Sequence, residues 1–330
     1  MAAIRLWVTL AVSWLMVNPV FAQTPIDPAL CHCYLTDKES SATFAHHKFF
    51  DFRDLPGAGV SDLIDDRDGS TNAPVTNEYF NSSNWTDTWA ITNYIHGSDD
   101  ATVWQTFSRN NLYVESNTDT SPGSNTYLTL RTVRHANNDF QSSAEIESAS
   151  ATYQYLSIRM YARTRGAAGG VTAMFTYRAN DIAAGVQEAD LEIRTQESNK
   201  LVSYTNQPSL VNGIPRLGAT RNISLSNQWT EWQEHRFDWT PGSSDWYAND
   251  ELAASIQFQT PIDPTSVLFK TWSDGGSWSG VMAVGGIAEM QIQWIDFLYN
   301  NTAEPSEFAS CANMCSVDLS PEVGVPVLVS

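Results

Sequence analysis

The run at residues 187–193, with the sequence QEADLEI, constrains the fold more than any other stretch of the chain. Side chains alternate between the two faces of a β-strand, so Glu188, Asp190 and Glu192 would share one face. The small and aliphatic residues between them would share the other face. This alternation predicts a strand whose apolar face packs against a second sheet.

The acidic face of this strand would carry three negative charges in a row. Like charges this close raise the free energy of the folded chain, and they push the pKa values of the carboxyl groups apart. Two carboxyl groups with separated pKa values are the apparatus of glycoside hydrolysis. A solvated strand face that happens to be acidic is the alternative interpretation.

Short β-type runs recur along the rest of the chain, with turn residues between them. No long amphipathic helix, internal repeat or linker interrupts the series. This spacing predicts one all-β domain, a sandwich or jelly roll of two antiparallel sheets. The expected strands cover residues 49–52, 111–115, 126–133, 144–148, 153–163, 171–177, 201–205, 232–239, 244–248, 255–259, 267–272 and 290–299.

Residues 1–22 have the features of a secretory signal peptide: Arg5, a mostly apolar stretch, and small residues before an expected cleavage site after Ala22. A signal anchor is the alternative, although the apolar stretch is short for a membrane span. We therefore expect a single domain over residues 23–315, a loosely ordered tail over residues 316–330, and a secreted protein of the extracellular space or cell wall.

The formal net charge of the chain is −19. A strongly acidic protein is not expected to bind nucleic acid or an anionic membrane through electrostatics. A neutral polysaccharide is a compatible partner, and we expect a monomer.

The four cysteines occur as two close pairs near the two ends, Cys31 with Cys33 and Cys311 with Cys315. A bridge within the first pair would be strained, so we expect the first pair to join the second in an oxidising compartment. The connectivity stays open, and a metal site with His32 is the alternative. Glycosylation sequons begin at four further positions, Asn81, Asn84, Asn222 and Asn300.

Six stretches, in order along residues 105–300, resemble family 16 of the glycoside hydrolases. The central stretch is Glu188-Ala-Asp190-Leu-Glu192, which is similar to the family signature Glu-x-Asp-x-Glu. The signature here has no extra residue, so the three acids stay in register without a β-bulge. The other stretches are GVTAMFTY at 170–177, VSYTN at 202–206, EHRFDWTP at 234–241 with DWY at 245–247, LFKTWSDGGSWSG at 268–280 and MQIQWIDFLY at 290–299.

The resemblance implies a concanavalin A-like jelly roll with a concave glycan cleft, and retaining glycosidase activity. It implies that Glu188 is the nucleophile, Glu192 the acid/base and Asp190 the helper between them. We expect the charge of Asp190 to keep Glu192 protonated. Sugar binding is expected of six residues, Tyr204, Asn206, Trp272, Trp278, Phe175 and His235, with core packing or turn chemistry as the alternative for each.

Two departures from the family pattern leave questions open. Gln293 stands where many members have an aspartate that helps to hold a structural calcium ion, so a calcium site is in doubt and no other cofactor is expected. Val186 and Gln187 replace the residues usual before the first glutamate, which leaves the substrate class open.

Three functions fit the sequence. The first is a secreted retaining endo-β-glucanase acting on 1,3- or mixed 1,3/1,4-β-glucan. The second is a cell-wall glucan or chitin transglycosylase on the same fold, because transfer to a sugar hydroxyl uses the same covalent chemistry. The third is a lectin-like glycan-binding protein without catalysis, which the three intact acids argue against. The twelve tryptophans decide little, because tryptophan both stacks on sugars and fills β-sandwich cores.

Overall fold

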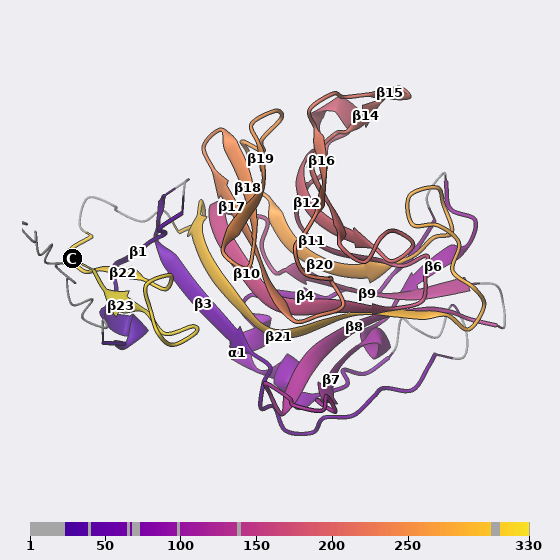
Figure 1. Cartoon of the computed structure of the whole chain (residues 1–330), viewed down its shortest axis with the longest axis horizontal. Coiled ribbons are helices and arrows are strands. Elements are labelled where there is room, and N and C mark those ends of the chain that lie inside the picture. The colour runs from indigo at the N-terminus through magenta and orange to yellow at the C-terminus, as the bar shows by residue number, and fades with distance from the viewer. Residues whose placement is uncertain are drawn as a thin grey trace, which may run out of the picture.

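The computed structural model describes residues 24–38, 41–64, 67, 73–97, 100–136, 140–304 and 311–329. The expected signal peptide lies outside this part of the chain. Two large, mostly antiparallel sheets pack face to face (Figure 1), which confirms the predicted all-β sandwich. Among the described residues, no helix has the length and apolar character needed to cross a membrane.

The first of these sheets, here called the cleft sheet, carries the acidic strand near its middle. All adjacent strands of the cleft sheet pair in antiparallel orientation. The strands, in spatial order, are β4 (Trp89–Ile91), β9 (Phe140–Ser148), β20 (Ser266–Trp272), β11 (Val171–Arg178), β12 (Gln187–Arg194), β13 (Leu201–Gln207) and β16 (Thr220–Ser224).

The second sheet, here called the outer sheet, is built around two long strands, β10 (Tyr153–Gly166) and β21 (Ile287–Asn301). Strand β9 also pairs with strands of this sheet, so the two sheets are joined along one side. The remaining outer strands are β3 (His46–Asp51), β5 (Ile95–His96), β6 (Trp104–Phe107), β7 (Leu112–Ser116), β8 (Thr126–Arg134), β17 (Gln233–Thr240), β18 (Ser243–Ala248) and β19 (Glu251–Ile256).

Short elements complete the described fold. The only α-helix among the described residues is the single turn α1 (Ser83–Thr86). A small hairpin of β14 (Leu210–Val211) and β15 (Ile214–Pro215) projects beyond β16 (Figure 1). The 3₁₀ turns are η1 (Pro28–Leu30), η3 (Glu78–Asn81), η4 (Arg109–Asn111) and η5 (Ala183–Gly185).

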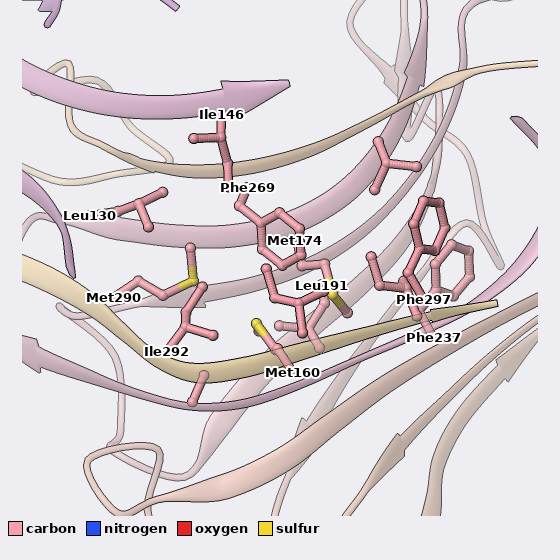
Figure 2. Packing of buried hydrophobic residues seen from close by; sticks show 14 of the residues in the cluster. Leu130, Ile146, Met160, Met174, Leu191, Phe237, Phe269, Met290, Ile292 and Phe297 are labelled. Carbon is pink, nitrogen blue, oxygen red and sulfur yellow. The ribbon is translucent and has the colours of Figure 1, made fainter. Parts of the chain in front are cut away.

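The main core lies between the two sheets, and Figure 2 shows part of it. Leu191 of the acidic strand packs there with Met174 and Phe269 from the neighbouring strands of the cleft sheet. Met160 and Phe297 meet them from the outer sheet. Burial of such side chains contributes about 1.5–3 kcal/mol each. Burial of the apolar side chains of the acidic strand therefore fixes its three acids on the opposite face.

Most expected strands are present with slightly different ends. The expected strand at residues 255–259 is wrong, because β19 covers Glu251–Ile256 instead. Beyond it the backbone turns, and Gln259 has a positive φ of 56°, which is incompatible with a strand.

The two ends of the chain form a separate four-stranded sheet of β2 (Thr43–Phe44), β1 (Cys33–Leu35), β22 (Met314–Ser316) and β23 (Val327–Leu328). Disulfides join Cys31 to Cys315 and Cys33 to Cys311, with Cα–Cα distances of 5.8 and 5.7 Å. The prediction that the first cysteine pair joins the second is confirmed.

The C-terminal segment differs from the expected loosely ordered tail. Strand β23 pairs with β22, and Asp318 forms ion pairs of 3.0 Å with both Arg159 and Arg236 of the outer sheet. These ion pairs hold the segment against the outer sheet, and no local sequence pattern predicts them.

Candidate active site

The three acids share one face of β12, as predicted. Strand β12 pairs in continuous register with β11 on one side and with β13 on the other, without a bulge. Leu191 and Ile193 are buried in the core. Glu188, Asp190 and Glu192 therefore point away from the core, into a cleft of about 520 Å³.

The cleft runs across several strands of the sheet and combines aromatic, acidic and hydroxyl groups. Its volume suits a carbohydrate segment of a few rings. It is lined by Thr92, Tyr94, His96, Glu145, Glu147, Ala173, Phe175, Tyr177, Glu188, Asp190, Glu192, Leu268, Lys270 and Trp272.

Asp190 is the most enclosed of the three acids, with 2% of its surface exposed. Burial raises the pKa of its carboxyl well above the usual range, and the charges of Glu188 and Glu192 raise it further. The Gln207 amide donates to Asp190 Oδ2 at 3.0 Å. This shift favours the protonated form of Asp190, whose hydrogen bond to Glu188 lowers the pKa of Glu188.

Glu188 and Glu192 are partly exposed to the cleft and otherwise surrounded by protein. Burial raises the pKa of each carboxyl to about 7. The charge of Glu188 adds to this rise at Glu192, whereas Lys270 lowers the pKa of both groups. Two interacting carboxyls that titrate near neutrality can share the tasks of proton donor and nucleophile.

A tryptophan holds the Glu192 carboxyl in place. Trp278 Nε1 donates to Glu192 Oε2 at 3.0 Å, and this bond lowers the pKa of Glu192. The Arg194 guanidinium lies 4.0 Å from the centre of the Trp278 ring and packs over the face of the indole. Trp278 was expected to bind sugar, and the structure places it on the carboxyl itself.

Of the other expected sugar-binding residues, Phe175 and Trp272 line the cleft. Phe175 lies directly opposite Asp190 on β11. Both rings can offer an apolar face to the C–H groups of a sugar.

Tyr204, Asn206 and His235 do not line the cleft, which corrects the expectation for all three. Tyr204 lies opposite Leu191 in the β12–β13 register, so it faces the core, where its ring is 5.5 Å from that of Trp246.

Asn206 and His235 face inward for similar reasons. Asn206 is fully buried and donates to the carbonyl oxygens of Ile256 and Phe258, at 3.3 and 3.0 Å. His235 is 1% exposed, and burial lowers its pKa to about 4, so its ring is neutral. It shares strand parity with the core residue Phe237.

Several cleft residues were missed by sequence reasoning. The register places Gln207 opposite Glu188 and Ser203 opposite Glu192, so odd-numbered residues of β13 lie on the same face of the sheet as the acids. The register of the hairpin formed by β12 and β13 would have supplied this signal. The connection between these strands, residues 195–200, is longer than the two-residue turns that fix a register. Lys270 and Glu145 were also missed, because their strands lie far from β12 in the sequence.

The aromatic residues near position 90 lie partly in the core and partly at the cleft. Trp85 and Trp89 are 1% exposed and pack in the core, whereas Tyr94 lines the cleft. Its hydroxyl donates to Glu145 at 3.2 Å.

The unexplained Gln187 binds a loop. Its side-chain oxygen accepts hydrogen bonds from the backbone amides of Ile262 and Asp263, at 2.6 and 2.9 Å, and its amide donates to the Asp263 carboxylate. A side-chain amide can accept and donate at the same time, so Gln187 ties the start of the acidic strand to this neighbouring loop.

The described residues contain no group of three or more histidine, cysteine, aspartate or glutamate residues arranged to hold a metal ion. At position 293 an amide replaces the expected carboxylate, and its backbone oxygen accepts a hydrogen bond from the Phe52 amide at 2.9 Å.

The sequon asparagines differ in exposure. Asn81, Asn84 and Asn222 are exposed, whereas Asn300 is partly buried and its side-chain oxygen accepts a hydrogen bond from the Ala45 amide at 3.0 Å. Glycosylation at these positions stays a prediction.

Comparison with known proteins is consistent with this cleft. The model of the family "Glycosyl hydrolases family 16" matches residues 102–296. The β-glucanase of Paenibacillus polymyxa is 25% identical over 136 residues, which are 40% of this chain and 54% of that protein. The β-glucanase of Bacillus licheniformis is 23% identical over 133 residues, 39% of this chain and 52% of that protein. The chain thus spans about half the length of these curated relatives.

Solved structures show the same fold. The Bacillus licheniformis β-glucanase superposes with a TM-score of 0.53 at 19% identity, over 65% of this chain and 94% of that one. The catalytic domain of an endo-1,3-β-glucanase from Thermotoga petrophila superposes with a TM-score of 0.51 at 13% identity, over 66% and 92% of the two chains. The expected jelly roll is confirmed, and because the family model covers more than half of its residues, the chain belongs to family 16 of the glycosyl hydrolases.

Proposed function

We propose that the protein is a retaining endo-β-glucanase that hydrolyses 1,3- or mixed 1,3/1,4-β-glucan. The observation that carries this proposal is the row of three carboxyls on the floor of the cleft, two of them with pKa values of about 7. Family membership and the β-glucanase names of the curated relatives support it.

In this mechanism Glu188 is the nucleophile. Its carboxylate attacks the anomeric carbon and forms a covalent glycosyl ester, while Glu192 gives its proton to the departing glycosidic oxygen. Glu192, now ionised, then removes a proton from water, whose oxygen attacks the same carbon and releases Glu188. The anomeric configuration is retained after two inversions.

Asp190 has a different part from the one expected. Its raised pKa makes it a proton-bearing neighbour of Glu188 rather than a charge that acts on Glu192. By donating to the Glu188 carboxylate it orients the nucleophile and favours its ionised form. Glu192 keeps its proton through burial and through the charge of Glu188.

The cleft favours an uncharged polymer. Phe175 and Trp272 supply apolar surface, and Gln207 and Tyr177 lie in register beside Glu188. The excess of carboxyls over cations would repel uronic or sulfated glycans. We further propose that the protein acts as a monomer and that it works outside the cell. The two disulfides that join its ends support the extracellular location, because an oxidising compartment preserves them.

The test is an assay of the purified protein on barley β-glucan, laminarin, xyloglucan and chitin, with labelled acceptor oligosaccharides present. New reducing ends on barley β-glucan or laminarin, without label in the product, support the proposal. Label in the product would indicate a transglycosylase instead. Binding without turnover on any of these glycans would indicate a lectin-like protein and would contradict the proposal.

A further inference from the structure

A chain of polar contacts crosses the cleft beside the acidic strand. Lys270 Nζ lies 3.1 Å from Glu145 Oε2, and the Tyr94 hydroxyl donates to both oxygens of the same carboxylate at 3.2 Å. The Lys270 side chain is 20% exposed and that of Glu145 is 5% exposed. The lysine is therefore held in one place by a buried carboxylate that is itself held by a tyrosine.

The strand register places Lys270 in the same row across the sheet as Glu192. Lys270 lies opposite Ala173, and Ala173 lies opposite Glu192 on the next strand. Two strand spacings separate the backbones of Lys270 and Glu192, roughly 10 Å. Since the residue between them in this row is alanine, β11 places no large side chain there.

Aromatic rings fix the ammonium further. Lys270 Nζ lies 4.6 Å from the centre of the Phe107 ring and 6.0 Å from that of Trp272. Lysine is rarely buried to this extent unless it is paired, and its desolvation costs free energy that one ion pair does not fully recover. Because Lys270 also lines the cleft, we look for a role in the reaction in addition to packing.

We propose that Lys270, anchored by Glu145 and Tyr94, is a positioning residue that places a fixed positive charge beside both Glu188 and Glu192 and so sets the pH range in which the pair works. This rests on the proposed function, because it assigns the pair its roles of nucleophile and acid/base.

The direction of the effect follows from the charges that face the pair. Lys270 favours the ionised form of each glutamate and lowers both pKa values, against the burial that raises them. The other charged or titratable groups around these carboxyls, from every neighbouring element, are Glu145 and Glu147 on β9, Tyr177 on β11, Asp190 and Arg194 on β12, and Tyr94 and His96 in the segment before β6.

The test is the pH profile of kcat/KM for the variant Lys270→Gln. In the free enzyme the acid limb reports ionisation of the nucleophile and the alkaline limb reports loss of the proton from the acid/base. Removing the positive charge raises both pKa values, so both limbs move to higher pH together. With an effective dielectric constant of about 20, a unit charge about 10 Å away corresponds to a shift of roughly one pH unit.

Two matched variants separate charge from packing. Lys270→Arg keeps the charge and should restore both limbs toward their original positions. Lys48→Gln removes the same charge from β3 of the outer sheet, where Lys48 donates to Thr88 Oγ1 at 2.6 Å, and should leave both limbs in place. A Lys270→Gln profile that is lower but not displaced would show a structural role and overturn the proposal.

A titration of the glutamate carboxyl carbons by NMR distinguishes failure of this inference from failure of the proposed function. If the protein turns over no glycan, the proposed function fails, but the two perturbed carboxyls can still be followed in protein labelled at the glutamate carboxyl carbon. Their pKa values should rise in Lys270→Gln and return in Lys270→Arg. Unchanged values in folded Lys270→Gln would refute the placement of the charge.

Discussion

Asp190 is the acid whose role the structure changes most. It is buried and hydrogen-bonds to Glu188, and in the proposed mechanism its contribution depends on a donor rather than on a charge. Asp190→Asn keeps an N–H donor, whereas Asp190→Ala leaves Glu188 without one. A hydrogen bond to a charged group contributes about 1.5–3 kcal/mol, so we expect kcat/KM of the alanine variant to be roughly 10- to 100-fold below that of the asparagine variant. Equal activity of the two variants would contradict this role.

Trp278 offers a second test at single-residue resolution. Its Nε1–H stabilises the ionised form of Glu192 and so lowers the pKa of that carboxyl. In Trp278→Phe the donor is lost and the pKa rises, so the alkaline limb of kcat/KM should move to higher pH while the acid limb stays. Trp272→Phe, which changes a cleft residue without this bond, is the control. Movement of both limbs in Trp278→Phe would disprove the assignment.

At the residue scale, sequence reasoning succeeded where period-two alternation alone decides the answer. It placed Glu188, Asp190 and Glu192 on one face because the strand has no bulge. It failed for Tyr204 and Asn206 because the face of a neighbouring strand depends on the hairpin register, which motif similarity does not supply. Gln207 and Lys270, which act on the acids, could not be predicted either, because their positions also depend on how the strands pair.

The acidic strand has a cost that can be measured without any substrate. The pKa of Glu192 is about 7 in the folded protein and 4.5 in its ordinary state, so the folded state binds more protons between these values. Stability from this group is therefore present below about pH 4.5 and is lost as the pH rises through 7. We expect Glu192→Gln to match the parent near pH 5 and to exceed its thermal midpoint at pH 8.

The control for this prediction is Glu251→Gln, which changes an exposed glutamate on β19. Its difference from the parent should be the same at both pH values. A Glu192→Gln protein that is no more stable than the parent at pH 8 would show that the raised pKa of Glu192 is absent.

At the scale of strands, the predictions were good in the middle of the chain and poor at irregular places. Long alternating runs such as those of β10 and β21 were found, although β10 extends beyond its expected C-terminal end and β21 beyond both of its expected ends. The strand β19 was misplaced, because a positive φ at Gln259 cannot be read from its residue type. Strand β9, which pairs with strands of both sheets, has no local signature for that behaviour.

At the scale of the whole molecule, the two disulfides close nearly the entire chain into a loop. The joined cysteines are separated by 284 and 278 residues, and removing a native disulfide typically costs 2–5 kcal/mol. Reductant should therefore lower the thermal midpoint of the protein. A variant with all four cysteines changed to serine should not respond to reductant, and an unchanged midpoint in the parent would contradict a stabilising role for the bridges.

The joining of the ends was predictable, because a bridge between Cys31 and Cys33 would be strained. The connectivity of the disulfides and the order of the C-terminal segment could not be predicted from the sequence. The segment is held by Asp318, which pairs with Arg159 and Arg236. Residues so distant in the sequence meet only once the outer sheet has formed, so no local pattern records the contact.

In the proposed mechanism Glu188 forms a covalent bond to the sugar while Glu192 supplies and removes the proton. The most direct measurement is mass spectrometry of the protein after incubation with a 2-deoxy-2-fluoro β-glucosyl oligosaccharide that carries a good leaving group, followed by peptide mapping. We predict that one sugar is attached and that it is on Glu188. Attachment to Glu192, or steady turnover with no attached sugar, would contradict the mechanism.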